Sequence, residues 1–172
     1  MPLSLPRAMK KGKGNSLRGS AFRMLALKDR SCRELRVALL KRGFAEAEVL
    51  NLVAEFEDKG YLDDEGLAER TVQYRLESGR TGPLRIRHEL LERGVAAGTV
   101  ERVVQQATKD VDLEEMALRL AVKKANARKA TSQVKQRGRV GRFLLGRGFS
   151  PTTVDRVIAR LFEEWAEPGP EF

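Results

Sequence analysis

Basic side chains gather in one stretch of this sequence. Residues 116–154 contain ten lysines and arginines and no aspartate or glutamate. Like charges spaced along a helix repel one another by roughly 0.3 kcal/mol per pair, whereas an ordinary solvated face mixes the two signs. The stretch is therefore suited to binding an external anion, either the phosphates of a nucleic acid or an acidic protein surface. The ten candidates are Arg119, Lys123, Lys124, Arg128, Lys129, Lys135, Arg137, Arg139, Arg142 and Arg147.

The remaining charge is spread unevenly along the chain. The formal net charge is +9, with +7 in residues 1–30, −5 in residues 31–115 and −3 in residues 155–172. Residues 1–17 combine lysine and arginine with glycine and serine and have little apolar surface to bury, so we expect a flexible basic segment there. Such a segment acts either as a basic arm that orders on binding or as a solubilising extension.

Residues that could support catalysis or hold a metal are isolated from one another. His88 and Cys32 are the only histidine and cysteine, so neither has the partners that a zinc site needs. The adjacent carboxylates of Asp63 and Asp64 point about 100° apart on a helix, which suits shared acid–base chemistry poorly. Gly12–Gly14 lacks the spacing of a phosphate-binding loop. We therefore expect a protein that is not an enzyme and needs no cofactor or metal.

The chain lacks the hydrophobic segments of a membrane or exported protein. No run approaches the roughly 18 apolar residues that a membrane-spanning helix needs, and the first fifteen residues lack an apolar signal core. A single cysteine suits a reducing compartment. The sequence predicts a soluble, cytoplasmic, monomeric protein without a membrane partner.

One short pattern occurs three times and sets the domain organisation. The strings LLKRGF, LLERGV and LLGRGF contain Gly43, Gly94 and Gly148, and apolar residues keep step before and after each glycine. Glycine readily adopts the left-handed backbone conformation that ends a helix, so we expect each of the three to end one. The aligned apolar positions are Leu35, Ile86 and Val140, then Leu39, Leu90 and Leu144, then Val49, Val100 and Val154.

We predict an all-α fold of three tandem three-helix repeats stacked into an elongated, curved array. Aromatic residues are only 6% of the chain, and the abundant Ala, Leu, Arg and Glu favour helix. Ser31 with Glu34 forms a capping box, and Pro83 and Pro151 suit first helical positions. The expected helices are 18–29, 31–42, 46–59, 63–78, 83–93, 97–109, 112–130, 135–147 and 151–166. The expected domains are the basic segment 1–17, repeats at 18–60, 61–110 and 111–166, and a tail at 167–172.

Helical phase predicts where the basic residues lie. The expected helix 112–130 turns them away from its buried stripe, for which the candidates are Leu118, Ala121, Val122 and Ala125. On the next helix, one face follows the i, i+4, i+7 spacing of Lys135, Arg139 and Arg142. The arginine before each repeat glycine either stabilises the helix C-terminus or contacts the anion. These arginines are Arg42, Arg93 and Arg147.

The strings GYLDDEGLAERTVQYR at 60–75 and GPLRIRHELLERGV at 82–95 resemble the RecX family of bacterial regulators of the RecA recombinase. The resemblance covers about residues 19–165 and is strongest in the middle repeat. Leu67 departs from it, because members commonly carry an aromatic residue there. The same string also suits a corner between repeats, with Gly60 ending one helix and Asp63 capping the next. The matching positions are Gly60, Tyr61, Leu62, Asp63, Asp64, Leu67, Ala68, Val72, Arg75, Gly82, Arg85 and Ile86.

The resemblance implies a regulator that binds the RecA–DNA filament and modulates its recombinase and co-protease activities, with inhibition the expected direction. The implied partners are RecA and single- or double-stranded DNA, in DNA repair and the SOS response. Arg75 and Arg85, the basic positions of the family pattern, join the candidate binding surface.

Two other functions compete with this one. The first is a free-standing DNA-binding protein, because three helices around a tight turn are similar to a helix-turn-helix. Its recognition helix, 100–107, offers only Arg102 for reading bases. The second is an RNA-binding helical repeat, which needs stacking aromatic side chains or a repeated code, and the third repeat offers neither.

Overall fold

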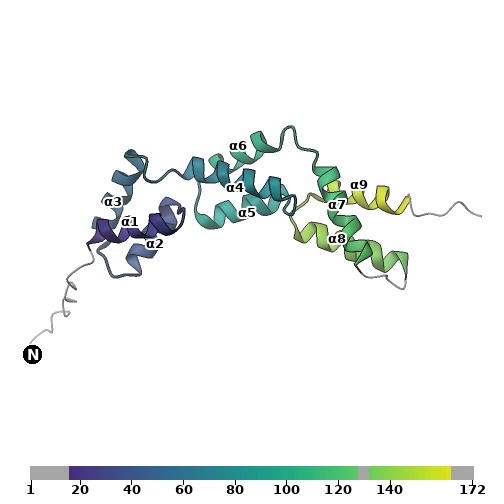
Figure 1. The fold of residues 1–172 in the computed structure, drawn as a ribbon, viewed down its shortest axis with the longest axis horizontal. Coiled ribbons are helices and arrows are strands. Elements are labelled where there is room, and N and C mark those ends of the chain that lie inside the picture. The colour runs from purple at the N-terminus through teal and green to yellow at the C-terminus, as the bar shows by residue number, and fades with distance from the viewer. Residues whose placement is uncertain (1–15, 128–131, 164–172) are drawn as a thin grey trace, which may run out of the picture. The chain divides into compact units, whose positions relative to one another are not determined.

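The computed structural model describes residues 16–127 and 132–163, which fold into helices joined by short turns (Figure 1). No strand occurs in this part of the chain, so the all-α prediction is confirmed. None of its helices is both long and apolar enough to cross a bilayer. The helices are α1 (Leu17–Leu27), α2 (Cys32–Leu40), α3 (Glu46–Asp58), α4 (Asp64–Ser78), α5 (Pro83–Arg93), α6 (Ala97–Thr108), α7 (Leu113–Asn126), α8 (Gln133–Gly146) and α9 (Pro151–Glu163).

The helices are grouped in threes, and each group of three has its own apolar core. The aligned residues Leu39, Leu90 and Leu144 are each fully buried, one in each core. The three-repeat prediction is thereby confirmed. The chain forms two compact units, one holding α1–α3 and the other α4–α9. In the second unit Leu76 packs against the cores of both repeats.

The repeat glycines end helices as predicted. Gly43, Gly94 and Gly148 have φ angles of +84°, +89° and +87°. After Gly94, the Val95 N–H donates to the Leu90 carbonyl oxygen (3.1 Å), and the third repeat makes the same bond. Such a bond reaches back around the left-handed residue and satisfies a carbonyl that the helix leaves unpaired. The LLxRG pattern is therefore a helix-ending signal, whatever else its arginines do.

Two details of the third repeat differ from the prediction. The buried residues of α7 are Met116, Ala117, Ala121 and Ala125, whereas Val122 is 36% exposed. Small alanines let α7 pack closely on its neighbours, and this rotates the buried face away from the larger Val122. The start of α8 is Gln133, two residues early, because the Ser132 hydroxyl caps it by accepting from the Lys135 N–H (3.3 Å). The expected ends at 130 and 166, the basic segment 1–15 and the tail 167–172 lie outside the described residues.

The second and third repeats are joined through their backbones. The Gly82 N–H donates to the Arg147 carbonyl oxygen (2.8 Å), and the Leu84 N–H donates to the Gly148 carbonyl oxygen (3.0 Å). A Cβ on Gly82 would overlap the Gly148 carbonyl group, and a Cβ on Gly148 would overlap the backbone of Arg85. Only glycine fits at both positions without movement of the backbone. We call this contact the glycine junction.

Candidate polyanion-binding cleft

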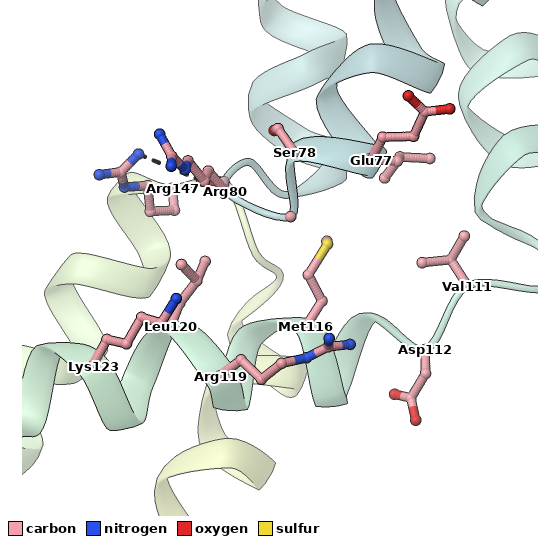
Figure 2. A pocket seen from close by; sticks show the side chains of 12 residues that line it. Glu77, Ser78, Arg80, Val111, Asp112, Met116, Arg119, Leu120, Lys123 and Arg147 are labelled. Atoms are coloured by element: carbon pink, nitrogen blue, oxygen red, sulfur yellow. Dashed lines mark hydrogen bonds between the residues drawn. The ribbon is translucent and has the colours of Figure 1, made fainter.

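A cleft of about 690 Å³ lies between the C-terminal end of α4 and one face of α7 (Figure 2). Four basic side chains line it, and they come from three segments that are distant in sequence. Arg119 and Lys123 project from α7, Arg80 lies in the turn between α4 and α5, and Arg147 follows α8. All four are exposed. We call this site the basic cleft.

The glycine junction brings Arg80 and Arg147 together. The backbone bond from Gly82 to the Arg147 carbonyl fixes the turn that carries Arg80 against the end of α8. The Arg147 Nη1 atom also donates to the Arg80 carbonyl oxygen (3.5 Å), as Figure 2 shows. Its guanidinium carbon lies 5.1 Å from the centre of the Phe143 ring, which orients the side chain through a cation–π contact. Two of the four cations are therefore positioned by the packing of one repeat on the other.

The other two cations are positioned by helical spacing. Arg119 and Lys123 are four residues apart, so they stand one turn apart on the same face of α7. The Arg119 Nε atom is 3.9 Å from a Glu115 carboxylate oxygen, and its side chain is 71% exposed. An exposed pair at that distance holds a side chain weakly. Arg119 is thus able to turn toward a ligand.

The cleft also has two carboxylates and an apolar floor. Glu77 accepts a hydrogen bond from the Gln73 side-chain amide (2.9 Å). Asp112 caps α7 by accepting from the Glu115 N–H (2.8 Å). Both carboxylates therefore have local structural partners. We call the large apolar lining residues of the cleft the floor, which contains no aromatic ring and consists of Leu76, Val111, Met116 and Leu120.

Two other predicted basic residues of the third repeat contact aromatic rings. The Lys124 Nζ atom is 5.0 Å from the Phe143 ring centre, so Phe143 contacts both Lys124 and Arg147. Arg137 stacks near Phe162, with its guanidinium carbon 5.4 Å from the ring centre. Both aromatic rings hold cations at the surface of the repeat rather than presenting an open stacking face.

Two of the remaining predicted residues are exposed, and two cannot be placed. Lys135 and Arg142 are exposed on α8, and their seven-residue spacing puts them on one face. Arg128 and Lys129 lie outside the described residues.

Two predicted arginines contact backbone carbonyl groups of the protein itself. The Arg85 Nη1 atom donates to the Gly146 carbonyl oxygen (3.0 Å), across the glycine junction. The Arg139 Nη2 atom lies within hydrogen-bonding distance of the Lys124 and Ala125 carbonyl oxygens (3.5 and 3.4 Å) at the end of α7. A cation at a helix C-terminus satisfies unpaired carbonyls there. These contacts give Arg85 and Arg139 structural roles.

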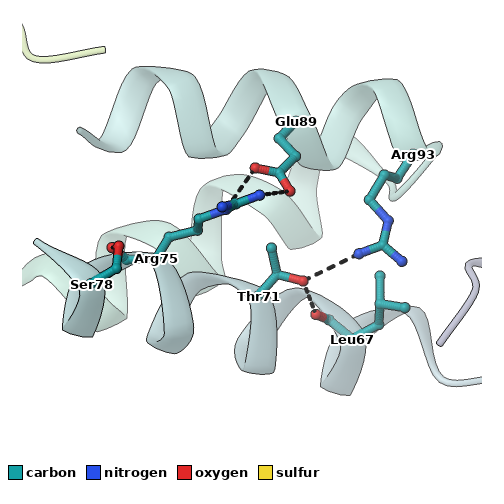
Figure 3. Close-up of polar contacts among 6 residues, drawn as sticks. All are labelled: Leu67, Thr71, Arg75, Ser78, Glu89 and Arg93. Atoms are coloured by element: carbon teal, nitrogen blue, oxygen red, sulfur yellow. Dashed lines mark hydrogen bonds and ion pairs between the residues drawn. The ribbon is translucent and has the colours of Figure 1, made fainter. Parts of the chain in front are cut away.

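Arg75 is held by a carboxylate within the second repeat (Figure 3). Its Nε and Nη2 atoms donate to the two Glu89 oxygens at 3.0 and 2.8 Å. The hydrogen bonds that Arg75 donates to Glu89 raise the pKa of Arg75, so its charge is fully retained in the pair. Beside it, Arg93 donates to the Thr71 hydroxyl (3.3 Å), which in turn donates to the Leu67 carbonyl oxygen (2.7 Å). These bonds tie α4 to α5.

Replacing Arg75 by glutamine is expected to affect stability and to leave anion binding unchanged. The pair with Glu89 is about one-third exposed, so its loss should lower the free energy of unfolding by about 0.5–1 kcal/mol. Urea denaturation followed by circular dichroism measures this change. Glu89→Gln removes the same pair and is the matched control. If Arg75→Gln bound anions more weakly while Glu89→Gln bound them as the parent does, Arg75 would have to be included in the binding surface.

Arg80 is the cleft residue that sequence reasoning missed. It lies in the turn SGRTG, outside the basic stretch 116–154 and outside any helix. The only sequence signal was the pair of glycines around it, Gly79 and Gly82, which marks a tight turn next to a helix start. Nothing in that signal indicates that the turn meets the end of α8.

Comparison with known protein families covers most of the chain. Models of RecX match it in the order of its repeats, with the first three-helix domain at residues 18–56, the second at 63–104 and the third at 110–158. The regulatory protein RecX of Halorhodospira halophila is 34% identical over 90% of this chain and 93% of its own length. That of Acinetobacter baylyi is 33% identical over 88% of this chain and 91% of its own length.

Solved structures show the same fold. The crystal structure of RecX from Lactobacillus salivarius matches with a TM-score of 0.74 and 22% identity, over 86% of this chain and 95% of that one. A second crystal structure of a regulatory protein RecX matches with a TM-score of 0.72 and 21% identity, over 82% of this chain and 70% of that one.

Proposed function

Since the chain belongs to the RecX family, we propose that it is a non-enzymatic regulator that binds the RecA–DNA filament. In this proposal it modulates, and in the expected direction inhibits, the recombinase and co-protease activities of the filament during DNA repair and the SOS response. Its curated relatives carry the name regulatory protein. It acts in the cytoplasm, as a monomer.

The observation that carries the proposal is the convergence of Arg80, Arg119, Lys123 and Arg147 around one cleft. Cations that come from both repeats and remain exposed are suited to an extended anionic partner. A DNA strand or an acidic face of a filament presents such charges at regular intervals.

The proposed contact surface extends from the cleft over the third repeat. It includes the exposed Lys135 and Arg142 and the ring-bound Lys124 and Arg137. Arg128 and Lys129 are included in this surface only because of their positions in the sequence. Arg75, Arg85 and Arg139 are left out, because each is engaged by another part of the protein.

Direct action on bare DNA through a recognition helix has less support. Arg102 on α6 pairs with Glu65 (2.7 Å), and this hydrogen bond raises the pKa of Arg102. Glu101 beside it pairs with Arg87 (2.8 Å), and that hydrogen bond lowers the pKa of Glu101. Reading a base would first require breaking the Arg102 pair and would place a carboxylate beside the bases.

Comparison of bare and RecA-coated DNA tests the proposal. Fluorescence anisotropy of the labelled protein is measured against single-stranded DNA alone and against the same DNA coated by RecA with a non-hydrolysable ATP analogue. The proposal predicts binding to the coated strand that is at least about tenfold tighter, which corresponds to roughly 1.4 kcal/mol of added contact with RecA. Equal or weaker binding to the coated strand would favour a free-standing DNA-binding protein.

A further inference from the structure

We propose that the basic cleft also receives the chain's own acidic segment, residues 164–172, which occupies it until an external polyanion displaces it. This inference concerns regulation of the cleft. It rests on one part of the proposed function, namely that the cleft binds anions. Three features of the segment identify it as the occupant: its negative charge, its starting point near the cleft and its aromatic side chains.

The acidic segment is complementary to the cleft in charge and polarity. It carries Glu164, Glu167 and Glu171, no lysine or arginine, and the aromatic residues Trp165 and Phe172. The cleft presents four cations and the two carboxylates of Glu77 and Asp112 around an apolar floor, so its lining keeps an excess of two positive charges. Carboxylates can therefore meet the rim while an aromatic side chain covers the floor. A nucleic acid strand would engage the cations but would gain no base stacking there, because the floor has no aromatic ring.

The segment begins within reach of the cleft. It follows α9, whose last turn carries Arg160. The Arg160 Nη1 atom is 3.4 Å from a Glu115 oxygen, and the other Glu115 oxygen is 3.9 Å from the Nε atom of Arg119 in the cleft wall. One carboxylate thus bridges the end of α9 and the cleft. Nine residues span up to about 30 Å when extended, which exceeds the distance across such a bridge.

Covalent linkage makes weak contacts sufficient. A segment tethered this closely has an effective concentration on the order of millimolar. An intrinsic dissociation constant of about 0.1–0.5 mM, which is weak for a separate peptide, then fills the cleft in roughly two-thirds to nine-tenths of the molecules. An external polyanion that binds more tightly displaces the segment at the cost of part of its affinity.

Trp165 reports on this contact because it is the only tryptophan. In the full chain at about 20 mM KCl, where charges act over tens of ångströms, we expect blue-shifted Trp165 emission that is protected from acrylamide quenching. At about 1 M KCl, where screening acts over roughly 3 Å, the emission should shift to the red and become readily quenched. Arg119→Ala with Lys123→Ala should show the high-salt behaviour already at low salt. The matched control, Lys135→Ala with Arg142→Ala, should behave as the parent.

Equal quenching in all three proteins at both salt concentrations would overturn the inference. Release of Trp165 by the control pair instead of the cleft pair would also overturn it, because the segment would then lie on α8. A dependence of the emission on protein concentration would place the segment on a second copy of the chain and overturn the intramolecular contact.

A second readout uses the affinity for an added polyanion, labelled oligothymidylate. Glu164→Gln with Glu167→Gln and Glu171→Gln should bind it about threefold to tenfold more tightly, as expected for the loss of a few exposed ion pairs. The control neutralises three exposed acids in the first unit, Glu48, Glu57 and Asp58, and makes the same change in net charge. Equal tightening in both variants would contradict occupation of the cleft. Neither measurement uses RecA, so failure here is distinct from failure of filament binding.

Discussion

Replacing Gly148 by alanine is expected to lower the free energy of unfolding of the α4–α9 unit by about 3 kcal/mol. About 1 kcal/mol of this comes from the left-handed backbone, since φ is +87°. The rest comes from the new Cβ, which would overlap the backbone of Arg85. Because backbone atoms cannot move aside as a side chain can, the junction must open and lose its two hydrogen bonds, at about 1 kcal/mol each.

Two other glycines separate these contributions. Gly43 has the same left-handed backbone (φ +84°), but a Cβ added there would meet no atom within 4 Å, so Gly43→Ala should cost only about 1 kcal/mol. Gly82 has an ordinary φ of −80° but meets the Gly148 carbonyl group, so Gly82→Ala should show the crowding cost alone. Urea denaturation measures the three costs, and amide hydrogen exchange at Leu84 reports opening of the junction. Equal costs for Gly43→Ala and Gly148→Ala would show that the junction contributes nothing.

Reversing the charge of two cleft residues is expected to weaken filament binding by roughly a hundredfold. Arg119→Glu with Lys123→Glu removes two cations from one face of α7 and adds two carboxylates to the cleft. A charge-assisted contact is worth at least about 1.4 kcal/mol, or tenfold, per residue. Both side chains are exposed, so the helical circular dichroism signal should not change. Anisotropy against RecA-coated DNA measures the loss.

The matched control places the same charge change elsewhere. Arg33→Glu with Lys41→Glu alters two exposed cations of the first unit and changes the net charge equally. We expect this variant to bind within about threefold of the parent, because neither residue lines the cleft. A similar loss in both variants would mean that filament binding responds to overall charge and does not involve the cleft.

The sequence predicted the helices well because their signals are local. A glycine at Gly94 can be recognised as a helix end from the apolar and basic residues just before it. Ser31 and Glu34 form the predicted capping box, with both of its bonds present. The recurrence of these signals at matching distances also revealed the three repeats.

The cleft depended on contacts that no local pattern encodes. Arg80 meets Arg147 across 67 residues of chain, through a backbone contact between two turns. The rotation of the buried face of α7 by Ala117 and Ala121 is a consequence of close packing between helices. Neither can be derived from hydrophobic periodicity, which predicts that a face is buried but not which neighbour covers it.

The same limit applies to the arginines that bind groups of the protein itself. Arg75 and Arg85 lie on polar helix faces, and a basic residue there has the same sequence context whether or not it contacts another part of the protein. Their partners, Glu89 and the Gly146 carbonyl group, lie 14 and 61 residues away. Which arginines contact their own protein could therefore be learned only from the tertiary structure.

The salt dependence of filament binding tests most directly whether the basic cleft carries recognition. If its four cations each replace a counterion on single-stranded DNA, a plot of log affinity against log KCl concentration should have a slope of about −3. Arg119→Ala with Lys123→Ala should flatten the slope by about 1.4. Binding that is insensitive to salt, or a slope that these two substitutions leave unchanged, would contradict the account.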